Sequence, residues 1–169
     1  MALSPGWKAP DFTTGTTAGP IRFHNWGYGC WRIVLTHPGD YSTRSLRAGI
    51  RWARTGSPPV HLLGLSPAHG ITAGTSANPC GFPPPGLPVI HDETGQIAAL
   101  WRGVTADIGP VGIPHDEHAV FIVDPTNTIR GTLTGPAAGG RDFAEVIGMA
   151  RGLGVEQPPL NRARRAPCQ

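Results

Sequence analysis

The 169-residue chain is predicted to fold as one α/β domain with a mixed central sheet flanked by helices. Two observations favour this class. Two short apolar runs enclose a segment with helical periodicity, as parallel strands joined by a crossover helix do. Two further strand-like runs follow, and an amphipathic segment comes after them. A chain of this length can bury a single core by itself.

The first unit is predicted from residues 31–35 and 60–65, two apolar runs of strand length that are rich in β-branched and aliphatic residues. Between them, the segment 45–54 places Leu46, Ile50 and Ala53 on one helical face. Ser42 or Thr43 is the candidate N-cap. These elements predict a parallel βαβ unit.

The second unit begins with residues 119–123 and 128–133, two strands that flank a turn-forming tetrad and predict an antiparallel hairpin. A closing helix is predicted from Asp142 as N-cap to a stop at Gly152 and Gly154. The order βαβ then ββα is that of the thioredoxin fold. The positions expected to be buried are Val34, Leu63, Phe121, Ile122 and Phe143.

The domain is expected to span residues 1–154, followed by a disordered basic, proline-rich tail at residues 155–169. Arg162, Arg164 and Arg165 account for the formal net charge of +3. Because no basic patch interleaved with aromatic residues is visible in the body, no nucleic-acid partner is expected.

Neither a membrane span nor a secretory signal is indicated, because no run of eighteen apolar residues and no charged region before an apolar one occurs. We therefore expect a cytoplasmic protein.

Cys30, Cys80 and Cys168 form no CxxC or zinc spacing, and the odd count argues against a secreted disulfide framework.

Residues 37–45, His-Pro-Gly-Asp-Tyr-Ser-Thr-Arg-Ser, resemble the H-P-x-D-F-T-P-x-C signature of the peroxiredoxins. Segments 7–12, 16–26, 87–92, 119–125 and 136–143 are similar to other motifs of that family in order and spacing. The last of them, with its Gly-Arg-Asp-Phe, favours the one-cysteine class. The resemblance runs from about Leu3 to Leu153 and implies a thioredoxin-like fold.

Ser45 stands where the family has its peroxide-attacking cysteine. Peroxide reduction needs a thiolate, which a serine hydroxyl cannot replace. The resemblance places His118 at the family's arginine before the hairpin strand, and Arg141 at the arginine of its G-R-N-F motif. A homodimer is implied by the family alone, and no cofactor is expected.

We predict a polar pocket at the N-terminus of the Ser45 helix, suited to an anion, carbonyl or enolate. Its candidate catalytic residues are His37, Tyr41, Ser45, His118 and Arg141. Its candidate substrate-binding residues are Asp40, Ser42, Thr43 and Arg44. In the alternative interpretation, His37 only caps the strand, Asp40 the turn, Tyr41 packs its ring, and Ser45 is an inert remnant rather than a nucleophile.

The leading hypothesis is a redox-neutral biosynthetic enzyme, such as an isomerase, cyclase, dehydratase or hydrolase, that acts on a small organic molecule. One alternative is a catalytically silent binding partner or subunit. Another is residual thiol chemistry at Cys80. His115 and His118 could also ligate a metal, but solvated loop charges are the preferred interpretation of that segment, and no metal is assigned.

Overall fold

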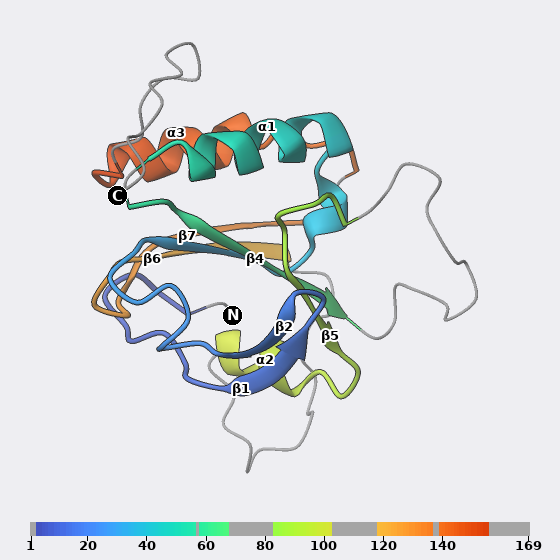
Figure 1. Cartoon of the computed structure of the whole chain (residues 1–169), viewed down its shortest axis with the longest axis vertical. Helices are drawn as coiled ribbons and strands as arrows, with labels where there is room; N and C mark the ends of the chain where they lie inside the picture. The colour runs from blue at the N-terminus through green and yellow to red at the C-terminus, as the bar shows by residue number, and fades with distance from the viewer. Residues whose placement is uncertain (1–2, 57, 68–82, 103–117, 137–138, 156–169) are drawn as a thin grey trace, which may run out of the picture.

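The computed structural model describes residues 3–56, 58–67, 83–102, 118–136 and 139–155. Its centre is a five-stranded sheet in the order β5-β4-β3-β6-β7 (Figure 1). These strands are β3 (Arg32–Leu35), β4 (His61–Pro67), β5 (Val89–Asp92), β6 (His118–Val123) and β7 (Ile129–Gly135). The pairs β3–β4 and β4–β5 are parallel, whereas β3–β6 and β6–β7 are antiparallel. The predicted mixed sheet is confirmed.

Each face of the sheet is covered by its own layer (Figure 1). Helices α1 (Thr43–Arg54) and α3 (Ala144–Gly152) lie side by side on one face. The hairpin of β1 (Thr13–Thr16) and β2 (Gly19–Arg22) lies with α2 (Gln96–Trp101) on the other face. Because strand residues point alternately to the two faces, the core divides into two clusters, one on each side.

The predicted βαβ unit is present. Ile33 of β3 pairs with Leu62 of β4 in a parallel register, and α1 makes the crossover between them. Leu46, Ile50 and Ala53 all face the sheet and are buried. Their burial stabilises α1 against the sheet by about 1.5–3 kcal/mol for each large aliphatic side chain.

The predicted hairpin and closing helix are also present, as β6, β7 and α3. The helix begins one residue later than expected, with Phe143 rather than Asp142 at the N-cap position. The Asp142 carboxylate nevertheless accepts a hydrogen bond from the Ala144 amide at 2.9 Å, which is the chemistry of a cap. All five positions predicted to be buried are buried: Val34, Leu63, Phe121, Ile122 and Phe143.

Five elements were not predicted: β1, β2, the short 3-10 helix η1 (Pro38–Asp40), β5 and α2. The predicted tail lies outside the described residues from 156 onward, although Val155 packs in the core. In the part of the chain that the structure describes, no helix is both long and apolar enough to span a membrane.

Candidate active site

The N-terminus of α1 is held to the segment that leads into α3. Ser42 caps the helix, and its hydroxyl accepts a hydrogen bond from the Ser45 amide at 3.2 Å. The Ser42 amide donates to the Arg141 carbonyl at 3.1 Å, and the Arg141 amide donates to the Asp40 carbonyl at 2.8 Å. Tyr41 and Arg141 therefore form an isolated parallel bridge between two distant segments.

The Ser45 hydroxyl is engaged by backbone groups. It accepts a hydrogen bond from the Phe143 amide at 3.2 Å, and it lies 3.1 Å from the Ser42 carbonyl and 3.3 Å from the Arg141 carbonyl, to either of which it can donate. No imidazole is among its contacts within the described residues. The structure thus does not bring Ser45 together with His37 or His118 as a nucleophile and base.

Two imidazoles and a carboxylate form the polar centre of the site. His118, at the start of β6, pairs through Nδ1 with the carboxylate of Asp40 in η1. The ring of His37 stacks on that of His118, with centroids 3.4 Å apart and planes 3° from parallel. The side chains of His118 and Asp40 are only 13% and 14% exposed. The sequence placed these three residues in one pocket, but it did not predict the pairing.

Thr36 is a site residue that the sequence analysis missed. Its hydroxyl accepts a hydrogen bond from the Ala119 amide at 2.8 Å, and the Ala119 carbonyl lies 3.0 Å away as its acceptor. The same oxygen lies 2.9 Å from Nδ1 of His37. All three contacts are satisfied together when Nδ1 of His37 carries the proton, which leaves Nε2 as the free acceptor. Its position directly before His37, at the end of a buried strand, was the available signal.

His37 is held neutral near pH 7. Burial, the neighbouring His118 and the cation of Arg102 lower its pKa from 6.5 to about 4, and Asp40 opposes them only in part. A neutral ring can stack face to face on His118 without charge repulsion.

The low pKa of His37 predicts a loss of stability in acid. Between pH 6.5 and about 4 the unfolded chain binds the proton that the folded chain refuses, so the free energy of unfolding should fall as the pH falls through this window. The charged and titratable groups that act on the ring are His118, Asp40 and Arg102. Urea denaturation of the wild type and of His37→Phe at several pH values measures the effect. The variant should show a smaller loss, and equal losses in the two proteins would contradict the assignment.

The ring of Tyr41 is packed, as the alternative interpretation expected, and its hydroxyl keeps its proton. Its ring packs edge-on against Phe143, with centroids 5.5 Å apart, and the Arg141 guanidinium lies 5.8 Å from its centroid. Burial, with Glu145 and Asp40 adding and Arg141 opposing, raises the pKa of its hydroxyl to about 12, so the hydroxyl stays protonated. Among the described residues this buried hydroxyl forms no hydrogen bond of ordinary geometry, and the nearby Glu145 carboxylate, as an acceptor, adds to the rise in its pKa. Arg141 itself pairs with Glu145 at 3.1 Å.

A small hollow joins most of the predicted site. It has a volume of about 10 Å³, which is room for about one water molecule. Its polar lining is His37, Asp40, Tyr41, His118 and Arg141.

The other predicted residues lie outside this hollow. Ser42 serves as the helix cap, Thr43 is the first residue of α1, and Arg44 is exposed on that helix. His115 lies outside the described residues, which hold no group of three metal-ligating side chains.

Comparison with individual known proteins identifies the family, although no family model matches the chain. A peroxiredoxin of Thermoplasma volcanium is 30% identical over 161 residues, covering 90% of this chain and 76% of the archaeal protein. The chain belongs to the peroxiredoxin family. Peroxiredoxin-6 of Macaca fascicularis is likewise 30% identical, over 154 residues, and the match covers 69% of its length.

Solved peroxiredoxin structures agree with this assignment. The yeast mitochondrial 1-Cys peroxiredoxin superimposes with a TM-score of 0.62 at 25% identity, over 89% of this chain and 76% of the yeast chain. A cysteine-to-serine mutant of peroxiredoxin 6 from Arenicola marina gives 0.61 at 25% identity, over 89% and 73%. The peroxiredoxin, thioredoxin-like fold predicted from the sequence is confirmed.

Proposed function

We propose that this peroxiredoxin-family protein is not a thiol peroxidase and instead carries out redox-neutral acid–base chemistry on a small organic molecule. The observation that carries the proposal is the pairing of His118 with Asp40, stacked against a neutral His37. A carboxylate that accepts the Nδ1 proton of an imidazole leaves Nε2 able to take up a proton, as in a general base.

The same site gives no support to peroxide reduction. Ser45, which matches the family's cysteine position, has an oxygen that is not ionised near pH 7 and hydrogen-bonds to backbone groups. Cys30 is the free cysteine of the described residues, and it precedes β3, at the opposite end of that strand from His37. Cys30 and His37 are seven residues apart, and seven residues of extended chain span roughly 20 Å, so Cys30 lies far from His37. Cys80 lies outside the described residues.

The neighbours of the His118–Asp40 pair fit proton abstraction beside a carbonyl. The protonated Tyr41 hydroxyl forms no hydrogen bond of ordinary geometry among the described residues, and its competing acceptor is the Glu145 carboxylate. In the proposed reaction this hydroxyl donates to the developing enolate oxygen instead. Arg141 adds a positive charge beside it. This arrangement favours an isomerase, cyclase or dehydratase over a hydrolase that would use Ser45 as nucleophile.

Deuterium exchange tests the proposal without knowledge of the natural substrate. A panel of small 2-oxo and 3-oxo acids is incubated with the protein in D2O, and loss of the carbon-bound proton is followed by NMR. His118→Gln and Asp40→Asn should each lower the catalysed exchange by about 10²- to 10⁴-fold. Ser45→Ala should stay within a few-fold of the wild type, and so should His91→Gln, which removes an exposed imidazole on β5.

Two results would contradict the assignment: exchange that survives His118→Gln, or exchange that Ser45→Ala abolishes as completely. In parallel, hydroperoxide turnover with a thiol reductant should remain at the uncatalysed rate. Turnover that disappears on Cys80→Ser would instead assign residual thiol chemistry to Cys80.

A catalytically silent binding partner is the second candidate, and the size of the hollow favours it. A volume of about 10 Å³ does not admit a substrate larger than water without movement of the lining. Absence of exchange across the panel, with association with an intact peroxiredoxin in size-exclusion chromatography, would favour this candidate. The same measurement tests the expected homodimer.

A further inference from the structure

Helix α1 carries four arginines on its outer side: Arg44, Arg47, Arg51 and Arg54. We call them the arginine stripe. At 100° per residue, spacings of three, four and three residues place them within an arc of about 80°, along about 15 Å of helix. All four are exposed. Leu46, Ile50 and Ala53 lie outside this arc, on the buried side of the helix.

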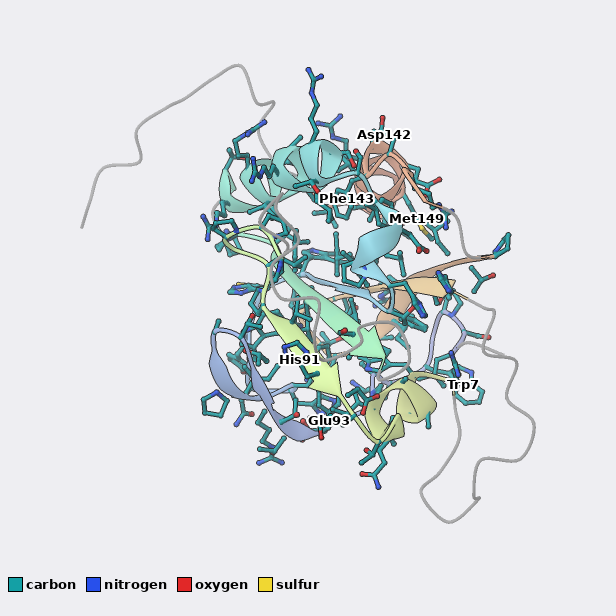
Figure 2. All side chains as sticks on the ribbon, turned by 90° about the vertical axis from the view of Figure 1, so that its right-hand side faces the viewer. Trp7, His91, Glu93, Asp142, Phe143 and Met149 are labelled. Carbon is teal, nitrogen blue, oxygen red and sulfur yellow. The ribbon has the colours of Figure 1, made fainter. Side chains whose placement is uncertain are left out.

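The stripe is not neutralised within the described part of the chain. Helix α1 contains no acidic residue, and the ion pairs found there use Arg22, Arg130 and Arg141 instead. Like charges three and four residues apart on a helix destabilise it by a few tenths of a kcal/mol per pair. An anionic partner would neutralise the four arginines and so offset the repulsion that destabilises the helix. Figure 2 shows nitrogen-tipped side chains projecting outward from α1.

The charge of the arginine stripe and its surroundings exclude several kinds of partner. A second copy of this protein would present the same positive charge, and the two stripes would repel each other. Insertion into a membrane needs an exposed apolar face, but the apolar side of α1 is buried in the core. A protein interface centres on apolar or aromatic residues. The helix residues beside the stripe on one side, Ala48 and Thr55, are small. Of the four arginines, Arg54 borders the hollow lined by Pro83, Pro84 and Pro85.

We propose that the arginine stripe binds the phosphate backbone of a nucleic acid without reading its base sequence. The guanidinium group presents a planar fork that matches phosphate oxygens, and such contacts need no apolar centre. The expectation of no nucleic-acid partner rested on the absence of interleaved aromatic residues. That absence removes base stacking, but it does not remove phosphate binding. This proposal is independent of the proposed acid–base function.

Salt dependence provides a quantitative test. Binding of the full chain to a fluorescent 20-base-pair DNA duplex is measured by anisotropy between 25 and 200 mM salt. Four phosphate contacts predict a slope of log K against log salt of about −3.6. The double variant Arg47→Gln/Arg51→Gln should reduce the magnitude of the slope by about 1.8. A duplex of scrambled sequence should bind equally well.

The matched control removes the same charge elsewhere. Arg22→Gln/Arg130→Gln replaces two exposed arginines that are already paired with Asp11 and Asp124, so the slope should change by less than one contact, about 0.9. Circular dichroism verifies that both double variants fold. An unchanged slope in the stripe variant overturns the proposal. So does loss of binding only when Arg162, Arg164 and Arg165 are replaced, or binding to anionic vesicles but not to the duplex.

Discussion

Replacing Gly49 by valine is expected to lower the free energy of unfolding by about 3 kcal/mol, the upper part of the range for overpacking. Gly49 is buried on the side of α1 that meets α3, and any Cβ atom there would overlap the ring of Phe143. Phe143 is itself fully buried against the core, so its ring cannot move aside without opening the α1–α3 contact.

This substitution should also disturb the candidate site. The Phe143 amide donates to the Ser45 hydroxyl, and the preceding segment carries Arg141 to its bridge with Tyr41. Urea denaturation gives the stability change, and proton NMR of the Tyr41 ring reports the site. The control is Gly148→Ala in α3, where a Cβ atom would meet nothing within 4 Å. It should stabilise the protein by up to about 1 kcal/mol. Equal effects of the two changes would refute the packing argument.

Replacing Asp124 by alanine is expected to cost about 3 kcal/mol. This carboxylate is 4% exposed and accepts four hydrogen bonds in the β6–β7 turn: two from Thr126, one from the Thr128 amide and one from Arg130. Removing it leaves amide and hydroxyl donors without an acceptor, at about 1–3 kcal/mol for each group that water cannot reach. Differential scanning calorimetry at neutral pH measures the loss.

The control for Asp124→Ala separates the stability due to the hydrogen bonds of the turn from the stability due to the ion pair with Arg130. Arg130→Gln removes only a cation that is 53% exposed, so it should cost at most about 1 kcal/mol. Burial alone would raise the pKa of the Asp124 carboxyl, but its hydrogen bonds hold the pKa below 3.8. Its contribution is therefore complete above pH 3.8 and is lost as the pH falls below that value. Similar losses in Asp124→Ala and Arg130→Gln would contradict the hydrogen-bond explanation.

The core elements of the fold were predictable because their signals are local. Leu46, Ile50 and Ala53 repeat at helical spacing, and the tetrad from Asp124 to Asn127 is rich in turn-forming residues. The short strand Val89–Asp92 pairs with β4, whose residues lie twenty-five positions earlier in the sequence. The strands β1 and β2 pair locally, but each has only four residues and their sequences, TTGT and GPIR, carry no clear strand pattern. Helix α2 has only six residues, too few for a clear periodicity.

The members of the candidate site were predictable, but their arrangement was not. The resemblance to the peroxiredoxins pointed to His37, Asp40 and His118 through their positions in the motifs. The pairing of Asp40 with His118 depends on how η1 meets the start of β6, across 78 residues of sequence. The tie of Ser45 to Phe143 spans 98 residues. Motif spacing carries no information about contacts made at this range.

The bridge between Tyr41 and Arg141 also affects the order in which parts of the protein fold during synthesis. It closes a loop of about one hundred residues, and every charged or imidazole group around the hollow depends on that closure or on β6. Contacts of such long range form late, because the chain must first lose the entropy of a large loop. A nascent chain that has emerged only as far as β5 would hold α1 with the strands β3 and β4, but without β6, the Arg141 segment and α3. The chemistry of the site therefore becomes available only after the chain has been synthesised beyond Arg141.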